Sequence, residues 1–193
     1  MAVSNFVTSQ YPSEAFVESC GAIVFDLSKE PAKVCLLHYQ ALDEWYLAKG
    51  RRNCGESRQE AALREVLEET GVRCRLLPVD MPTRAPAPDD DANAPDVAAE
   101  RRAIIEPFTL TIRSIDQGDG VKLIWWYVAT VEGRPDWKDE EEGVTAGGEA
   151  QFIAKFFVCD EAVEKLTFEN DRKVLRKAID LVRKTTSESQ SAK

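Results

Sequence analysis

The chain has 193 residues, a length that suits a single domain with its own hydrophobic core. Its formal net charge of -9 at pH 7 excludes broad nucleic-acid binding, which requires a surface with excess positive charge. No apolar stretch reaches the ~18 residues of a membrane-spanning helix, so we expect no membrane partner.

The cysteines and the N-terminal residues bear on the cellular compartment. The five cysteines are scattered without a C-x-x-C pair, which is typical of reduced thiols. The first residues, MAVSNFVTSQYPSEAF, contain neither the basic segment nor the apolar run of a signal peptide. We therefore expect a cytoplasmic protein.

Strand-forming segments come first along the chain. Residues 1–17 are polar and mixed in character, and they predict an N-terminal arm. The runs at 19–27 and 32–39 are apolar and rich in strand formers, and the turn at 29–31 joins them into a predicted hairpin. A short strand at 43–48 then leads into a loop.

A helix is predicted to follow this loop. Ser57 and Glu60 form a capping box, the run RQEAALREVLEET consists of strong helix formers, and Gly71 is a typical C-terminal cap. In a helix of this register, Glu65 and Glu69 lie one above the other on the same face.

The helix carries a cluster of carboxylates that suggests a metal site. Glu68 flanks the face that holds Glu65 and Glu69, and three like charges repel one another. A divalent cation such as Mg2+ or Mn2+ relieves this repulsion, because hard cations bind carboxylate and phosphate oxygens. The loop from Gly50 to Glu56 returns the backbone to the helix start, where a carbonyl can add a ligand. Such a site can activate water and polarise a phosphoanhydride.

A solvent-exposed helix rich in Glu and Arg is the simpler interpretation of the acidic run alone. The spacing of Gly50 and Glu56 upstream of the helix favours the metal site. Lys49, Arg51 and Arg52 lie beside the acidic cluster. We expect them to bind substrate phosphates, because an acidic protein that acts on a polyanion needs local positive charge.

The composition changes after the helix. A strand at 72–77 is followed by residues 78–103, which are rich in Pro, Asp and Ala and poor in large apolar residues. Such a segment buries too little apolar surface to order itself. We therefore expect a surface insertion that acts as a spacer or as a lid over the substrate.

The remaining chain predicts more strands and a packed C-terminal helix. The strands are expected at 104–112, 122–131 and 151–158. Apolar residues at helical spacing predict a helix over 169–184, and the polar tail at 187–193 is expected to fray. The sum is an α/β protein, an α/β/α sandwich with a mixed sheet, in one domain at 18–186.

The segment from Gly50 to Val72 resembles the signature of the Nudix hydrolases. It follows the pattern G-x5-E-x7-R-E-U-x-E-E-x-G-U, where U is aliphatic, at every position. The resemblance implies a Nudix-type sandwich with a catalytic loop-helix and a C-terminal helix. It also implies a hydrolase that cleaves a phosphoanhydride of a small-molecule polyphosphate with the help of Mg2+ or Mn2+.

The resemblance implies roles for four residues at the metal. Glu65, Glu69 and the carbonyl of Gly50 would be metal ligands. Glu68 would be a ligand or the base that activates water.

Three further residues would support this centre in a protein of this family. Arg64 would orient the carboxylates by ion pairing, and Glu56 would support the loop. An acid from a late loop often assists, and Glu149 is the candidate here.

A narrower resemblance concerns the substrate. The run AKGRRNCGES resembles the PKG-x4-GES form of diphosphoinositol polyphosphate and diadenosine polyphosphate hydrolases, with Ala48 where that subclass has proline. Lys49 and the two arginines after Gly50 favour a highly phosphorylated substrate, and inositol pyrophosphates fit this basic cluster best. Diadenosine polyphosphates or an mRNA cap are the alternative, and a non-catalytic ligand-binding protein is the third. The sequence makes no prediction about oligomeric state.

Overall fold

The computed structural model describes residues 5–28, 30–91, 93, 95–115, 119–133, 144–145 and 152–191. The strands are β1 (Phe16–Asp26), β2 (Lys33–Tyr39), β3 (Glu44–Tyr46), β4 (Lys49–Arg51), β5 (Cys74–Leu76), β6 (Val79–Thr83), β7 (Ala99–Ile104), β8 (Thr109–Ile115), β9 (Gly120–Val131), β10 (Val144–Thr145) and β11 (Phe152–Val158). The helices are η1 (Ser13–Ala15, a 3-10 turn), α1 (Arg58–Thr70), α2 (Cys159–Lys165) and α3 (Glu169–Ser191).

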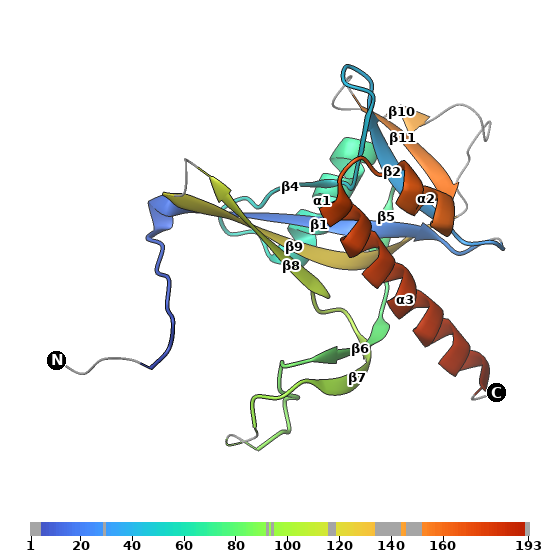
Figure 1. Ribbon diagram of the computed structural model, residues 1–193. Coiled ribbons are helices and arrows are strands. Elements are labelled where there is room, and N and C mark those ends of the chain that lie inside the picture. Colours follow the sequence, from blue (N-terminus) through green and yellow to red (C-terminus); the bar gives the residue numbers. More distant parts are fainter. Residues whose placement is uncertain are drawn as a thin grey trace.

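The centre of the molecule is a mixed sheet around β1 (Figure 1). Within the described residues the order is β10-β11-β2-β1-β9-β5, with β3 added to β2, β4 to β1 and β8 to β9. Strand β1 is parallel to β9 and antiparallel to β2 and β4. Its sequence, FVESCGAIVFD, is nearly continuously apolar because helices cover both faces of its C-terminal half.

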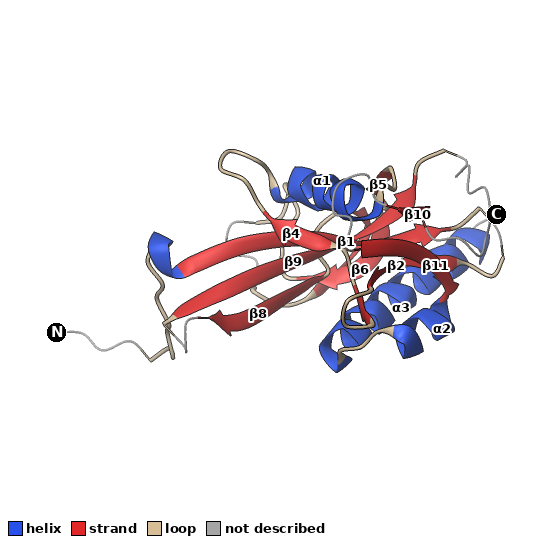
Figure 2. Ribbon diagram, turned by 90° about the horizontal axis from the view of Figure 1, so that it is seen from above, coloured by secondary structure: helices blue, strands red, loops and turns tan. Residues whose placement is uncertain are grey.

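Helices lie on both faces of the sheet (Figure 2). Helix α1 packs its small residues Ala61, Ala62 and Val66 against one face. Helices α2 and α3 cover the other face, where Leu175 and Ile179 belong to the larger core cluster. The predicted α/β/α sandwich with a mixed sheet is therefore confirmed.

Helix α1 begins and ends where its local signals predict. The N–H of Glu60 donates to Oγ of Ser57 (3.1 Å), and the N–H of Ser57 donates to Oε2 of Glu60 (2.9 Å), which completes the capping box. At the other end Gly71 adopts a left-handed conformation with φ of 70°, and its N–H donates to the carbonyl of Leu67. These caps fix the register that places the glutamates.

The segment at 78–103 is more ordered than its composition suggests. Its ends form β6 and β7, which pair with each other, and Val79 and Met81 are only 2% exposed. The N–H of Asp80 donates to Oγ1 of Thr185 on α3 (2.8 Å). The expectation that this segment cannot order itself is wrong for β6 and β7. Val79 and Met81 are two residues apart on β6, so their side chains point to the same side and are buried in the core shared with α3, and β7 pairs with β6.

The C-terminal helix is also longer than expected, because α3 runs on to Ser191 through the polar tail. The hydroxyls of Thr185 and Thr186 donate to the carbonyls of Leu181 and Val182, four residues earlier. Each hydroxyl shares the carbonyl that the helix's own N–H group uses, so both threonines find a hydrogen-bond partner inside the helix. The domain limits at 18 and 186 stay a prediction.

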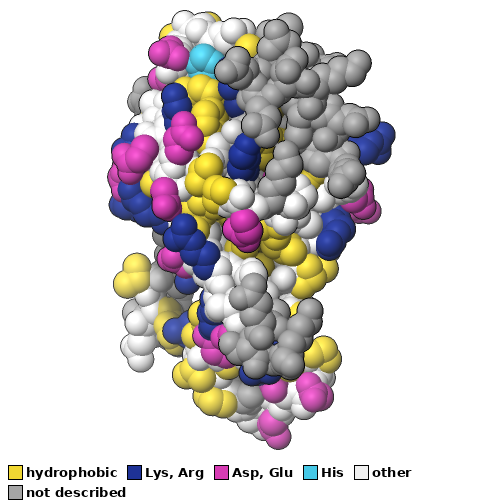
Figure 3. Space-filling view, turned by 90° about the vertical axis from the view of Figure 1, so that its right-hand side faces the viewer, with side chains coloured by type: hydrophobic (Ala, Val, Ile, Leu, Met, Phe, Trp, Pro, Cys, Tyr) yellow, Lys and Arg dark blue, Asp and Glu magenta, His cyan; other side chains and the backbone are white. Residues whose placement is uncertain are grey.

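The surface carries charges of both signs. Acidic and basic side chains are interspersed on the described part of the face seen in Figure 3. Among the helices that the structure describes, none combines the length and apolar character needed to cross a membrane.

Candidate active site

The catalytic loop and α1 meet at Gly50, on the short strand β4. A Cβ atom built on Gly50 would lie 1.8 Å from Oε2 of Glu65 and 2.2 Å from its carboxyl carbon. The carboxylate of Glu65 therefore lies directly against the backbone of Gly50, in space that only glycine leaves open. Glu65 is 9% exposed, and this burial raises the pKa of its carboxyl above the usual value, while Arg64 opposes the change.

One guanidinium organises the acidic cluster. Arg64 donates through Nε and Nη2 to the two carboxylate oxygens of Glu56 (2.7 and 3.0 Å). Its Nη1 donates to Oε1 of Glu65 and to Oε2 of Glu68, both at 2.8 Å. Its Nη2 also donates to the backbone carbonyl of Arg51 (2.9 Å). Arg64 thus joins the loop, the strand and the helix at one point.

This contact has a large electrostatic effect on the loop carboxylate. The hydrogen bond from Arg64 is the main reason that the pKa of Glu56 falls from its ordinary value of 4.5 to about 2. The N–H of Asn53 also donates to Glu56 (2.9 Å) and acts in the same direction. Glu56 therefore stays ionised and holds the loop closed on α1.

The remaining carboxylate, Glu69, approaches the same strand. The N–H of Lys49 donates to Oε2 of Glu69 (2.7 Å). Glu65 and Glu69 therefore both reach the Lys49–Gly50 segment from successive turns of α1. Glu68 is 57% exposed and is turned toward Arg64 instead.

The donor set suits a hard divalent cation. Carboxylate and backbone oxygens are the ligands that Mg2+ and Mn2+ prefer, and Gly50 lets the Glu65 carboxylate lie directly against the backbone. In the described part of the chain, no three acidic, His or Cys side chains are gathered closely enough to hold an ion as they stand. Glu65 and Glu68 both accept a hydrogen bond from Nη1 of Arg64, while Glu69 accepts one from the N–H of Lys49.

The three cations predicted to bind substrate have different surroundings. Arg52 is engaged by the protein, because its Nε donates to Glu18 (2.9 Å) and its Nη1 donates to the carbonyl of Glu56 (2.8 Å). Lys49 and Arg51 use only backbone groups in the contacts above, and among the described residues neither of their charged ends forms an ion pair. The predicted residue Glu149 lies outside the described residues.

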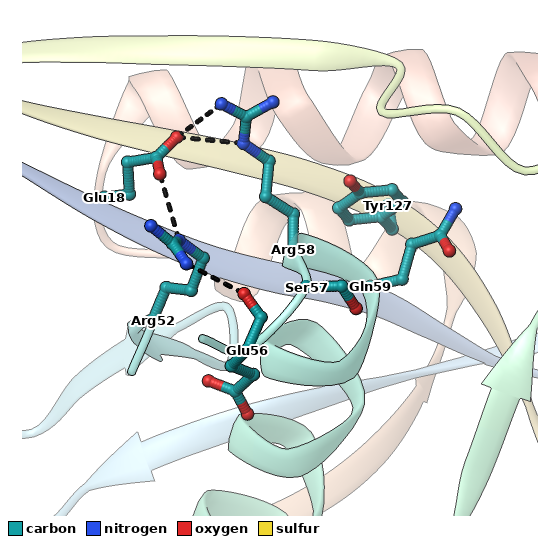
Figure 4. A pocket seen from close by; sticks show the side chains of 7 residues that line it. All are labelled: Glu18, Arg52, Glu56, Ser57, Arg58, Gln59 and Tyr127. Atoms are coloured by element: carbon teal, nitrogen blue, oxygen red, sulfur yellow. Dashed lines mark hydrogen bonds and ion pairs between the residues drawn. The ribbon is translucent and has the colours of Figure 1, made fainter. Parts of the chain in front are cut away.

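Glu18 on β1 is a residue that the sequence analysis missed. Its carboxylate accepts hydrogen bonds from Arg52 (2.9 Å) and from Nη2 of Arg58 (2.6 Å) (Figure 4). It also accepts one from Nε1 of Trp125 (2.9 Å). The guanidinium of Arg58 also lies 4.1 Å from the centre of the Trp125 ring. The only signal in the sequence is a single acid inside an otherwise apolar strand.

An aromatic pocket of about 240 Å3 adjoins the acidic cluster. Tyr39, Tyr46 and Phe152 line it together with Lys49 and Glu69. These aromatic side chains come from β2, β3 and β11, so only the folded sheet brings them to the site. The pocket offers flat apolar surface next to a cation and a carboxylate.

Comparison with known proteins places this arrangement in a family. A family model described as NUDIX domain matches residues 16–178. The C. elegans Ap4A hydrolase, in a binary complex, has a TM-score of 0.56 and 16% identity, and the match covers 86% of this chain and 98% of that one. The NUDIX domain of Shewanella oneidensis NrtR complexed with ADP ribose gives 0.55 and 16%, covering 88% and 92%. A NUDIX hydrolase from Nitrosomonas europaea gives 0.53 and 15%, covering 83% and 86%.

The three structures share the fold with this chain, and at such identities they show the fold alone. The family model is more informative, because it runs from β1 to the middle of α3 and so includes the loop and helix described above. The chain therefore belongs to the NUDIX family.

Proposed function

We propose that this protein is a metal-dependent pyrophosphohydrolase that cleaves a phosphoanhydride bond. The observation that carries the proposal is the contact of the Glu65 carboxylate with Gly50. Glu69 reaches the same strand, and a hydrogen bond from Arg64 fixes the orientation of Glu65. A purely structural acidic helix would not need a carboxylate buried against a glycine backbone. The intact set of carboxylates also argues against a non-catalytic ligand-binding protein.

The residues of the site divide the work. Glu65, Glu69 and the backbone of Gly50 would hold Mg2+ or Mn2+, with Glu68 as a further ligand. When bound, the ion polarises the phosphoryl oxygen and lowers the pKa of water. Arg64 keeps the carboxylates of Glu65 and Glu68 oriented. Less conformational entropy of these side chains is therefore lost when the transition state forms.

Glu68 is the group best placed to accept a proton. It is the most exposed of the three carboxylates, and it can leave Arg64 without disturbing the buried Glu65. We assign it to remove the proton from the attacking water. Arg64 retains Glu56 and Glu65 as partners during this step.

Inositol pyrophosphates are the proposed substrate class. Lys49 and Arg51 come directly before and after Gly50 on β4, so two cations lie on the same short strand as the glycine that contacts Glu65. Charge-assisted hydrogen bonds to phosphate are stronger than neutral ones, and several are needed to draw a polyanion to an acidic protein.

Nucleotide polyphosphates are the second candidate, and the aromatic pocket favours them. Tyr39, Tyr46 and Phe152 can stack against a base whose phosphates reach Lys49. One of the similar structures is the Ap4A hydrolase of C. elegans, and diadenosine tetraphosphate belongs to this class.

The test is a substrate panel with and without Mg2+. A diphosphoinositol polyphosphate, a diadenosine polyphosphate and capped RNA are compared at equal concentration by phosphate or product release. We expect Mg2+-dependent turnover with the inositol pyrophosphate preferred. A clear preference for the diadenosine compound would replace the first candidate by the second, and tight binding without turnover of any substrate would support a non-catalytic protein.

Substitution of the carboxylates tests the mechanism. We expect Glu68→Gln and Glu69→Gln to lower kcat by at least about 100-fold while the thermal unfolding midpoint changes little. Glu161→Gln, at an exposed position of α2, is the matched control and should retain full activity. Full turnover by both site variants would refute these roles.

A further inference from the structure

The strand register gathers four basic side chains on one face of the sheet. On β4, Lys49 pairs with Gly21 of β1 and Arg51 pairs with Ser19. On β9, Lys122 pairs with Val17 of β1 and, on its other side, with Arg113 of β8. Paired residues and residues two apart share a face. Lys49, Arg51, Lys122 and Arg113 therefore all point to the side opposite α1.

Contacts within the sheet agree with this placement. A Cβ atom on Gly21 would lie 2.7 Å from Cβ of Lys49 and 2.8 Å from the Trp126 ring, so these two side chains close over Gly21 on one face. Nε1 of Trp126 donates to Oγ1 of Thr111 on β8 (3.1 Å), so the side chain of Thr111 lies on the same face of the sheet as that of Trp126. Arg113 is two residues beyond Thr111 on the same strand.

This part of the sheet extends past the helix that covers the rest of the face. Figure 2 shows β1, β8 and β9 running well beyond α3. Asp171, in the first turn of α3, lies 3.5 Å from Nη2 of Arg113 and so marks the border of the covered region. The side chain of Arg113 is 45% exposed, and Lys122 is half-buried.

The four cations are poorly neutralised. Among residues that the structure describes, their only ion pair is the one between Arg113 and Asp171. Burial lowers the pKa of Lys122, and the charges of Lys49, Arg113 and Arg51 lower it further, while the charge of Glu65 opposes the change. The four cations therefore lie within electrostatic reach of one another, and Lys122 is within reach of the acidic cluster as well.

The strand between these cations, β1, also carries a polar side chain on the same face. The hydroxyl of Ser19 is buried beneath them, and it has no hydrogen-bond partner in the described chain. A region with excess positive charge and a free hydroxyl is favourable for an anion and costly without one.

Resting on the proposed function, we infer that Arg113 and Lys122 bind phosphate groups of the substrate that lie away from the scissile anhydride. They would act with Lys49 and Arg51 as residues that determine specificity for a compact, multiply phosphorylated ligand. Three strand spacings separate β4 from β8, about 14 Å, so one phosphate cannot contact both ends of the group. A ring that carries many phosphates can.

The test separates binding from turnover. The affinity for inositol hexakisphosphate is measured by calorimetry without metal for the wild type, Arg113→Gln, Lys122→Gln and the double variant. We expect each single change to weaken the Kd about tenfold and the double change about a hundredfold, because each removes a charge-assisted hydrogen bond. Arg75→Gln and Lys177→Gln, at exposed positions on β5 and α3, are the matched controls and should bind like the wild type.

Kinetics with a diphosphoinositol polyphosphate and Mg2+ complete the design. The two single variants and the double variant should raise KM and leave kcat within about twofold. Lys122→Arg, which keeps the charge, should restore most of the affinity. Binding of inositol hexakisphosphate that is absent in the wild type, or equal in variants and controls, overturns the inference. Failure of the wild type to hydrolyse any substrate, with the binding pattern intact, refutes the proposed function and leaves the binding face standing.

Discussion

At the scale of single residues, the site depends on two groups that fix the position of one carboxylate. Gly50 leaves the space that the Glu65 carboxylate occupies, and Arg64 holds that carboxylate from the other side. Neither group needs to touch the reacting phosphorus. Their effect is to hold an oxygen donor in place before substrate arrives, which avoids reorganisation during the reaction.

A side chain at Gly50 should therefore displace Glu65. Gly50→Ala puts a carbon 1.8 Å from Oε2 of Glu65, so the carboxylate must move. We expect kcat/KM to fall by about 100-fold, since a displacement of about 1 Å can cost this much. The check is a double-mutant cycle with Glu65→Gln. Non-additive losses show that the two changes act through the same carboxylate, and additive losses contradict the argument.

The Glu56–Arg64 pair makes a prediction about pH. The pKa of Glu56 is about 2 in the folded protein against an ordinary 4.5, so the pair stabilises the fold above pH 4.5 and loses this effect as the pH falls toward 2. The thermal midpoint of Glu56→Gln should lie below that of the wild type at about pH 7, and the gap should narrow below pH 4.5. A gap that stays constant over this range, as expected for the exposed control Glu161→Gln, would contradict it.

At the scale of elements, the loop between β4 and α1 is held at both of its ends by one residue of β1. Glu18 binds Arg52 near the start of the loop and Arg58 in the first turn of α1. These contacts, together with that of Trp125, hold the pKa of Glu18 below its usual value against the opposing effect of burial. The loop is thus tied to the sheet through ionic contacts.

Glu18 should therefore act as a positioning residue. We expect Glu18→Gln to raise the Mg2+ concentration for half-maximal activity and to lower kcat, each by about tenfold, as is usual for groups that orient metal ligands. Glu14→Gln, at an exposed position in η1, is the control. A lower thermal midpoint with an unchanged Mg2+ requirement would reduce Glu18 to a structural role.

The elements also show which parts of the site a sequence can predict. Helix α1 was predictable because its capping box, its glycine stop and the i, i+4 spacing of Glu65 and Glu69 are all local. Glu18, Lys122 and Arg113 were not, because only the pairing of distant strands brings them together. A pattern along one strand gives the face on which a residue lies, but not its neighbours across the sheet.

At the scale of the molecule, the sheet separates catalysis from most of the stability. The larger core lies between the sheet and α3, and β6 adds Val79 and Met81 to it. The acidic cluster lies on the opposite side, where α1 meets β4. A change in the larger core should therefore alter stability much more than the rate of the reaction.

Met81→Ala tests this separation. Met81 is 2% exposed in the core shared with α3, and a Met→Ala change in a core typically costs about 2–5 kcal/mol. We expect the free energy of unfolding in urea to fall by about 2–4 kcal/mol, with kcat/KM within about twofold of the wild type. Val97→Ala, in the same segment but 59% exposed, should change neither quantity. If Met81→Ala is as mild as this control, residues 78–103 are a loose spacer after all, as composition alone would suggest, and β6 does not belong to the folding unit.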